Sequence, residues 1–273
     1  MTKSILAFAE HKEGKFKNSA FEVVSEASKL AKECSAEMVV LAIGEIDQSA
    51  ADVLSAFGAT KLILVSLSEL NSKSPVSGIQ YSPSATAKVI SAVAGKESAE
   101  TIVLSATALG KELAGRVAVM TDSAVFNDCT ELIAASGKIS AARPVYAGKS
   151  IISISSDSEK ILITIRPNVF KPERKEESNV ELIKMTPDDL AVTSADFSVA
   201  VKEIVVSSEK LDVAEADRIV SGGRGMKGPE HFNLVEDLAN AIGAATGASR
   251  AVVDAGWRPH SEQVGQTGKT VSP

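Results

Sequence analysis

The sequence predicts an α/β protein: a mostly parallel sheet with helices on both faces and an antiparallel β edge, followed by an incomplete flavodoxin-like or Rossmann-like domain. Short apolar runs alternate with amphipathic segments up to residue 122, which is typical of βα units. Hydrophobic residues make up 44% of the chain but aromatic residues only 4%. A core of Ala, Val, Ile and Leu suits parallel strands that are buried on both faces.

The first half alternates strands and helices in a regular order. Helices are expected from residues that recur with helical spacing and from flanking capping residues, such as Asp47 before one helix and Gly58 after it. The predicted strands are Ile5–Ala9, Met38–Ile43, Leu62–Val65 and Ile102–Leu104. The predicted helices are Asn18–Cys34, Asp47–Phe57, Ser84–Ala94 and Leu109–Met120, the last beginning after Thr107.

After Asp122 the pattern changes to short β-rich segments. They are Thr130–Ala134, Pro144–Tyr146, Ile151–Ile154 and Ile161–Ile165, and we expect them to form an antiparallel edge. Residues 171–179 are charged and contain no apolar side chain. We interpret them as a solvated loop in preference to a docking site.

A length of 273 residues suits two domains, which we place at residues 1–190 and 199–273. Val199–Val206 could be an arm strand, and a second βα unit then begins with Arg218–Ser221. Its helix, Glu230–Ala244, presents His231, Val235, Leu238, Ala239 and Ile242 as the inward face. A domain of this kind needs roughly 100–150 residues, so the second domain is incomplete or borrows structure from a partner.

The glycines Gly223, Gly225 and Gly228 follow a predicted strand and precede a helix, which is the context of a dinucleotide-binding loop. Arg224 adds a phosphate donor. We favour phosphate binding over a simple tight turn. Asp254 ends the next predicted strand, Ser249–Asp254, and it is equally consistent with a ribose-binding acid and with a loop anchor.

Two further motifs accompany this loop. Ser249 and Arg250 follow the flexible Gly247. The segment Gln263–Thr270 resembles a phosphate-binding P-loop, but Gln263 stands where that pattern needs glycine, so we reject an ATPase. Gln266 and Thr267 remain as hydrogen-bonding groups on a flexible loop.

Several classes of function are excluded by composition. The net charge is −6 without a basic run, which argues against nucleic acid, and no apolar run has transmembrane length. We expect a cytoplasmic protein, because the N-terminus leads directly into a strand and the two cysteines suggest no disulfide framework. The three histidines lack metal-ligand spacing, and no nucleophile–base arrangement is visible. We therefore expect no metal site.

Taken together, the motifs Ser221–Gly228, Gly247–Asp254 and Gln263–Lys269 resemble the α subunit of electron transfer flavoproteins. The segments Ser105–Lys111 and Gly115–Ala118 also look like this family. The resemblance implies a first domain that packs against a β subunit and a second domain that holds FAD. It also implies that the family continues past the third motif with a Ser-Gly-Ala-Ile-Gln-His segment, so that this chain is truncated at its C-terminus relative to the family.

The resemblance assigns a role to each motif residue. Arg224 contacts the diphosphate, Ser249 the phosphate–ribityl part and Arg250 the isoalloxazine. The loop Gln263, Val264, Gly265, Gln266 and Thr267 lines the flavin, with Thr267 near its N5 atom. A fixed positive charge at Arg250 is expected to raise the flavin potential.

The function that the resemblance implies is electron carriage without substrate chemistry. Electrons would pass from dehydrogenases, such as the acyl-CoA dehydrogenases of fatty acid β-oxidation, to a membrane quinone oxidoreductase. Two alternatives stay open. One is an NAD-dependent oxidoreductase that uses the glycine loop at residues 223–228, and the other is an interaction subunit without a cofactor.

Overall fold

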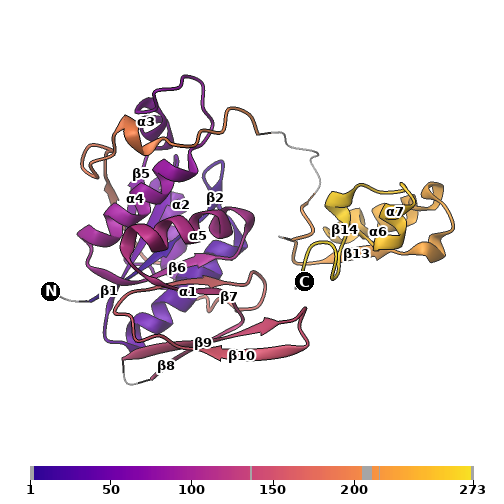
Figure 1. The fold of residues 1–273 in the computed structure, drawn as a ribbon, viewed down its shortest axis with the longest axis horizontal. Helices are drawn as coiled ribbons and strands as arrows, with labels where there is room; N and C mark the ends of the chain where they lie inside the picture. Colours follow the sequence, from indigo (N-terminus) through magenta and orange to yellow (C-terminus); the bar gives the residue numbers. More distant parts are fainter. Residues whose placement is uncertain (1–2, 136, 205–210, 215, 272–273) are drawn as a thin grey trace. The chain divides into compact units, whose positions relative to one another are not determined.

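A computed structural model describes residues 3–135, 137–204, 211–214 and 216–271 of the chain. The chain forms two compact units, Met1–Ile204 and Val205–Pro273 (Figure 1). Both contain parallel strands joined by helices, as the predicted α/β class requires.

The first unit is built on a seven-stranded sheet in which all neighbouring strands run parallel. The strands lie in the order β12 (Glu181–Lys184), β5 (Lys61–Val65), β4 (Glu37–Ile43), β1 (Ser4–Phe8), β6 (Ala99–Ser105), β11 (Ile161–Ile165) and β7 (Ala124–Cys129). The chain adds β4 and β5 on one side of β1 and β6 and β7 on the other; β11 then inserts between β6 and β7, and β12 returns to the first side beside β5. This is a doubly wound sheet, and the four strands predicted in the first half are confirmed.

Helices cover both faces of this sheet and enclose two hydrophobic cores. Successive residues of β1 alternate between them, because Ile5 and Ala7 enter one core while Leu6 and Phe8 enter the other. The helical segments are α1 (Asn18–Glu33), α2 (Gln48–Val53) and η1 (Leu54–Phe57) beside the first core, and α3 (Leu67–Ser72), α4 (Pro83–Lys96), α5 (Ala108–Thr121) and η2 (Ser194–Asp196) beside the second. The four predicted helical segments are confirmed, although the second ends in a 3₁₀ turn.

The predicted capping residues lie where helices begin and end. Asp47 accepts a hydrogen bond from the backbone N–H of Ala50 at 2.8 Å, and Gly58 takes a left-handed φ of 101°. Thr107 accepts from the N–H of Gly110 at 3.0 Å and donates to the buried carboxylate of Glu10. Thr107 therefore joins the start of α5 to the end of β1.

An antiparallel sheet of three strands follows the parallel strand β7. Its order is β10 (Ser150–Ile154), β9 (Lys138–Val145) and β8 (Glu131–Ala135). The antiparallel edge is thus confirmed, but the assignment of Ile161–Ile165 to it is wrong. These residues form β11, which lies parallel between β6 and β7. All five are buried, so this β-branched run has the pattern of an interior parallel strand.

The charged segment 171–179 lacks regular structure, as predicted, and most of its side chains are exposed. Its backbone is nevertheless anchored to the helical layer. The N–H groups of Glu173, Lys175 and Ser178 donate to Ser25 Oγ, Ala56 O and Ser55 Oγ at 3.0, 2.7 and 2.7 Å. The solvated side chains therefore stand on a fixed main chain.

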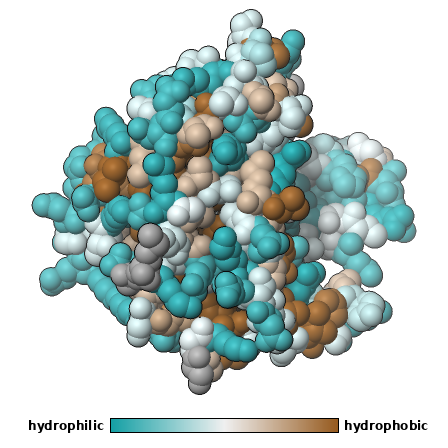
Figure 2. Space-filling model, turned by 60° about the vertical axis from the view of Figure 1, so that its left-hand side comes forward, coloured by the Kyte–Doolittle hydropathy of each residue, from teal (hydrophilic) through white to brown (hydrophobic). Residues whose placement is uncertain are grey.

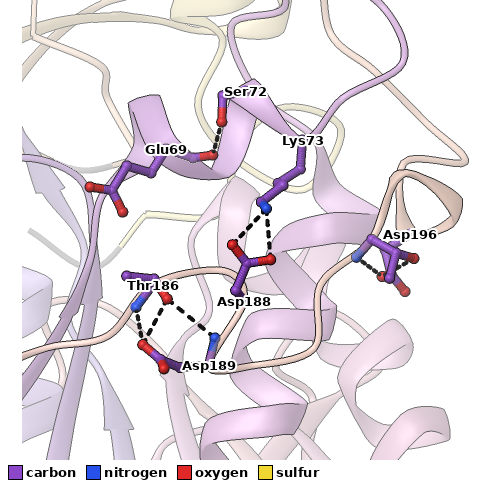
Figure 3. Close-up of polar contacts among 8 residues, drawn as sticks. Glu69, Ser72, Lys73, Thr186, Asp188, Asp189 and Asp196 are labelled. Atoms are coloured by element: carbon purple, nitrogen blue, oxygen red, sulfur yellow. Dashed lines mark hydrogen bonds and ion pairs between the residues drawn. The ribbon is translucent and has the colours of Figure 1, made fainter.

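Polar contacts also hold the segment that follows β12 (Figure 3). Lys73, at the end of α3, donates to both carboxylate oxygens of Asp188 at 2.7 Å. The turn at Thr186 is closed by Asp189, whose Oδ2 accepts from the Thr186 N–H at 2.8 Å and from its hydroxyl at 2.7 Å. The expected arm strand Val199–Val206 does not form in its described part, because only Val201 makes a β-bridge, to Tyr81. Val205 and Val206 lie outside the described residues.

The second unit contains one complete βα unit and short helical turns. Its elements are β13 (Ile219–Gly222), η3 (Arg224–Met226), η4 (Pro229–His231), α6 (Asn233–Ile242), β14 (Ala245–Ala248), α7 (Arg250–Asp254) and η5 (His260–Glu262). The inward face predicted for its main helix is partly wrong. Val235 and Ala239 are buried, whereas His231, Leu238 and Ile242 are exposed. The two-stranded sheet covers only a narrow stripe of α6. Phe232, at the start of the helix, is buried against the sheet in place of the exposed residues.

A further hairpin of the first unit, β2 (His11–Lys12) with β3 (Lys15–Phe16), completes the strands of the described residues. Figure 2 shows the surface of the molecule on one side, where hydrophobic side chains are interspersed with hydrophilic ones.

Candidate functional site

The three glycine-containing motifs meet at one edge of the small sheet in the second unit. β13 and β14 run parallel, with Gly222 opposite Ala248, so their carboxyl ends lie side by side. Gln263 adds a parallel bridge to Ala248 on the other side of β14. The loops that begin at Gly223, Ser249 and Gln263 therefore start next to one another. This edge of a parallel sheet is where open α/β folds bind ligands.

Two glycines at this edge are required by close packing. A Cβ at Gly222 would lie 2.6 Å from the ring of Phe232, which packs the start of α6 against β13. A Cβ at Gly268 would lie 2.4 Å from the carbonyl oxygen of Gln263. These glycines hold the loops close to the strands. Gly223 and Gly225, in contrast, face open space, with no atom nearer than 3.9 Å to a Cβ built on them.

The first loop departs from a dinucleotide fingerprint. Its residues form the short turns η3 and η4, Lys227 has a left-handed φ of 67°, and α6 begins only at Asn233. The glycines therefore do not open directly into a helix as that fingerprint requires. Arg224 is exposed, and its side chain makes no hydrogen bond or ion pair within the described residues. Its guanidinium is available to a ligand.

The second loop corrects the predicted strand Ser249–Asp254. The strand ends at Ala248, and Arg250–Asp254 forms the short helix α7 with Ser249 as its N-cap residue. Asp254 lies at the end of that helix and forms an i,i+4 pair with Arg250 at 3.3 Å. It does not lie at a strand end, where a ribose-binding acid is needed. The Ser249 hydroxyl makes no capping bond, so it too is available.

The third loop is folded on itself. Gln263 is buried, and its side-chain amide donates to the Thr267 hydroxyl at 3.0 Å. The N–H of Lys269 donates to the Gln263 carbonyl at 2.8 Å, and Gly265 permits the bend with a φ of 113°. Val264 is half-buried, while Gly265, Gln266 and Thr267 are exposed. The buried Gln263 side chain thus fixes the shape of the loop, and the tip of the loop is exposed to solvent.

Sequence reasoning missed the residues that hold this loop in place. Arg258 forms a bidentate pair with Glu262 at 2.6 and 2.7 Å, and it also donates to Glu236 on α6 at 2.9 Å. These carboxylates raise the pKa of the Arg258 guanidinium, which also lies 5.4 Å from the centre of the Phe232 ring. Lys269 pairs with Asp212 at 2.7 Å. Only the i,i+4 spacing of Arg258 and Glu262 is visible in the sequence.

The described residues contain neither a metal-binding cluster nor a membrane-spanning helix. No group of three or more His, Cys, Asp or Glu side chains is placed to hold a metal ion there. Within the same residues, no helix has the length and apolar character needed to cross a membrane. His231 is exposed and lies 3.6 Å from Glu230, so it is not the packed histidine expected from the helical stripe.

Family models match most of the chain. Residues 5–190 match the electron transfer flavoprotein domain, and residues 212–273 match the electron transfer flavoprotein FAD-binding domain.

The chain belongs to the electron transfer flavoprotein family, as an α subunit.

Curated relatives agree over the whole length. The chain is 35% identical to the electron transfer flavoprotein subunit alpha of Thermoanaerobacterium thermosaccharolyticum, over 99% of this chain and 80% of that protein. It is 30% identical to the corresponding subunit of Bacillus subtilis, over 100% of this chain and 80% of that protein. It is 34% identical to a probable mitochondrial subunit alpha of Caenorhabditis elegans, over 99% of this chain and 76% of that protein.

This electron transfer flavoprotein α subunit therefore uses FAD, because its second unit is the FAD-binding domain of the family. The residues at the sheet edge fit such a cofactor. Gly223 and Gly225 leave room for close approach to the backbone, and Arg224 and the Ser249 hydroxyl lack partners among the described residues. An anionic diphosphate needs these two features, an open backbone and unpaired donors.

Proposed function

We propose that this α subunit holds FAD at the joint edge of β13 and β14, with Arg224, Ser249, Arg250 and the loop 263–267 as its contacts. The observation that carries the proposal is the convergence of three loops, each with an unused polar group, at one strand edge. In this assignment residues 199–273 form the cofactor domain, and residues 1–190 form the domain that contacts a β subunit.

Each proposed contact is made by a side chain whose polar groups have no strong partner within the described residues. Arg224 and the Ser249 hydroxyl would bind the diphosphate and its neighbouring oxygens. The Arg250 side chain is 66% exposed and is held only by a helical i,i+4 pair, which is weak. It can therefore turn toward the ring system, where its charge stabilises added negative charge.

The loop 263–267 acts through its shape. Gln263 is buried and positions Thr267 by the 3.0 Å hydrogen bond, so we assign Gln263 as a positioning residue and Val264–Thr267 as the lining. Bound FAD would supply a centre that takes up and gives up electrons. The protein's part is to bind, orient and electrostatically tune that centre without converting a substrate of its own.

As a partner set we propose the β subunit, dehydrogenases such as those acting on acyl-CoA, and a membrane quinone oxidoreductase, with the complex working in the bacterial cytoplasm during fatty acid β-oxidation. The names of the relatives as alpha subunits support the β subunit. An NAD-dependent oxidoreductase is the weaker alternative. Two sequence features favour it, the glycine loop and Asp254. The loop does not lead directly into α6, and Asp254 lies in a helix and not at a strand end.

Co-expression with the β subunit of the same organism tests the proposal. We expect a yellow complex with flavin absorbance, and Arg224→Ala should lower flavin content at a fixed dialysis time. Arg218→Ala is the matched control, because Arg218 lies at the opposite end of β13 and donates to Ile242 O at 3.1 Å. A colourless wild-type complex would support the interaction subunit without a cofactor. Equal flavin retention in both variants would remove Arg224 from the site.

A further inference from the structure

A pocket lies between helix α1 and the loop 171–179, wholly within the first unit. Its volume is about 260 Å³. Its buried wall includes Glu26 and Ser28 of α1 and Phe57 at the end of η1. Its exposed rim includes Lys32 of α1 with Glu173 and Lys175 of the loop. We call this space the α1 pocket.

The shape of the α1 pocket is fixed by the anchored main chain of the loop. The N–H of Glu173 donates to Ser25 Oγ at 3.0 Å, and the N–H of Lys175 donates to Ala56 O at 2.7 Å. These bonds hold the loop beside α1 and leave the space between their side chains open. A ligand would therefore meet walls that are already ordered, which lowers the entropic cost of binding.

Glu26 is a buried acidic residue without an adequate partner. It is 8% exposed, and its carboxylate accepts no hydrogen bond within the described residues. Its ion pair there is with Lys29, at the long distance of 3.9 Å. Burial raises the pKa of the Glu26 carboxyl, and Lys29 compensates for this only in part. A buried charge is costly unless it is paired and hydrogen-bonded, so this carboxylate is suited to a cationic donor.

Ser28 is a second buried polar residue in the wall of the pocket. It is 7% exposed, and its hydroxyl makes no hydrogen bond in the described part of the chain, not even to the carbonyl one helical turn before it. Gly58 packs against it so closely that a Cβ at Gly58 would lie 2.2 Å from Ser28 Oγ. A hydroxyl both donates and accepts, so Ser28 can bind either a cationic or an anionic group.

The rim brings two lysines together without a carboxylate between them. The ammonium group of Lys175 adjoins that of Lys32 and lowers its pKa, through direct contact and through charge repulsion. Neither side chain forms an ion pair within the described residues. Glu173 is exposed, and its charge acts on both Lys32 and Glu26, so it neutralises neither. An anion bound between the two ammonium groups would remove their repulsion.

The groups that need a cation and those that need an anion lie apart along α1. Six residues separate Glu26 from Lys32, which corresponds to about 9 Å along the helix axis. Phe57 adds an apolar surface to the same pocket. A simple anion would satisfy the two lysines and leave Glu26 unpaired, and a simple cation would do the reverse. A molecule that carries both charges, joined by apolar carbons, satisfies all of these groups.

We propose that the α1 pocket binds a small zwitterion of the ω-amino-acid class, with its ammonium group on Glu26, its carboxylate between Lys32 and Lys175, and its methylene chain against Phe57. The volume of the pocket is below that of sites for drug-sized ligands, which suits a molecule of this size. The first unit thus has a ligand site of its own. This site is independent of the proposed flavin contacts, because every residue that forms it belongs to the first unit.

Titration calorimetry of the full-length chain with 5-aminovalerate tests the proposal at neutral pH. Valerate lacks the ammonium group and pentylamine lacks the carboxylate, so each should bind at least about tenfold more weakly. Glycine carries both charges but cannot span the pocket, and we expect the same loss of about tenfold. Equal binding of valerate or pentylamine would overturn the zwitterion as the ligand class. Equal binding of glycine would overturn the arrangement with two separate ends.

Variants of the same chain test where the ligand lies. Glu26→Gln and Lys175→Gln should each raise the dissociation constant of 5-aminovalerate at least about tenfold. Lys171→Gln is the matched control, because Lys171 belongs to the same exposed loop and does not line the pocket, and it should change the constant less than about threefold. If Glu26→Gln fails to fold, the exposed Lys175→Gln keeps the test valid. Unchanged binding in Lys175→Gln, an equal loss in Lys171→Gln, or a wild-type chain that does not bind 5-aminovalerate would overturn the site. None of these results would change the flavin content by which the proposed function is tested.

Discussion

The two units bury apolar surface in very different ways. In the first unit every strand of the parallel sheet contributes to cores on one or both faces. In the second unit, the apolar residues gather in two small clusters, one around Phe232 and one around Val213. Ion pairs at Arg258 and Lys269 join its loops. The stability of the first unit thus rests on buried apolar surface. The stability of the second unit depends on a few polar contacts and on the cofactor that binds there.

The sharpest test of this comparison is to express the units separately. We expect residues 1–204 to unfold in one cooperative transition, because a covered seven-stranded sheet is a complete core. Residues 205–273 should show no cooperative transition without cofactor, because so short a segment with two small clusters buries too little. Trp257, the single tryptophan of the chain, reports on the second unit by fluorescence, and circular dichroism reports on the first. A steep Trp257 transition in the isolated second unit would break the comparison.

A deletion in the large core should have the next largest effect. Leu41 is fully buried on β4, so Leu41→Ala should lower the free energy of unfolding by about 2–5 kcal/mol. Leu234→Ala is the counterpart in the second unit, where Leu234 is 62% exposed, and it should change stability by less than about 0.5 kcal/mol. Urea unfolding followed by circular dichroism and by Trp257 measures both. If both variants lost a similar free energy of unfolding, Leu234 would be buried and not exposed.

Removal of a polar contact should affect the second unit in particular. Arg258→Met removes the hydrogen bonds that Glu262 and Glu236 accept from the guanidinium, and we expect a loss of about 1–3 kcal/mol in the Trp257 transition of the full, cofactor-loaded chain. Arg250→Met is the matched control, because the Arg250 side chain is 66% exposed against 14% for Arg258. That exposed helical pair contributes about 0.3–0.5 kcal/mol. If the two variants are equal, Arg258 does not hold the loops.

Thr107→Ala tests a polar contact inside the well-packed unit. The substitution removes the cap of α5 and the hydroxyl that donates to Glu10, and we expect a loss of about 1–2 kcal/mol by urea unfolding. Thr107→Ser keeps the hydroxyl and should recover most of this stability. A serine variant as unstable as the alanine variant would assign the effect to the lost methyl group.

The smallest expected effect is a pH dependence in the first unit. Burial lowers the pKa of His11, whose ring nitrogen lies 3.0 Å from the carbonyl oxygen of Ile43. The unfolded chain therefore binds a proton more readily, and stability falls as pH drops from about 6.5 through the lowered pKa of the folded chain. His11→Gln should remove this part of the slope in thermal unfolding between pH 7.5 and 5.5. An unchanged slope would assign the titration to other groups.

Much of the first unit was predictable because local signals and burial agree there. Alternating apolar runs gave its strands and helices, and Asp47, Gly58 and Thr107 marked helix ends by their chemistry. Ile161–Ile165 was misplaced because a β-branched run indicates a strand but not its neighbours. Its neighbours β6 and β7 are set by pairing across the fold.

The second unit was harder to read because less packing enforces its pattern. Ser249–Asp254 has the apolar run of a strand, yet the chain turns into α7 once β14 has ended at Ala248. The predicted inward face of the helix included His231, Leu238 and Ile242. These residues are exposed because a sheet of two strands covers only part of that face. The convergence of the three motifs was expected from the resemblance. The pairs of Arg258 with Glu236 and of Lys269 with Asp212 were not expected, since long-range ion pairs leave no local signature.

The anchored loop 171–179 has a consequence for handling the protein. Arg174 and Lys175 give trypsin two cleavage sites in a segment with exposed side chains, because the bond after Lys171 leads into Pro172 and resists trypsin. A protease must draw several residues into its cleft as a free extended strand, and the bonds from Glu173, Lys175 and Ser178 to the helical layer prevent that. Limited digestion of the native chain should therefore spare this segment. Its length is constrained by the positions of its anchors, while its charges outside the α1 pocket are free to vary.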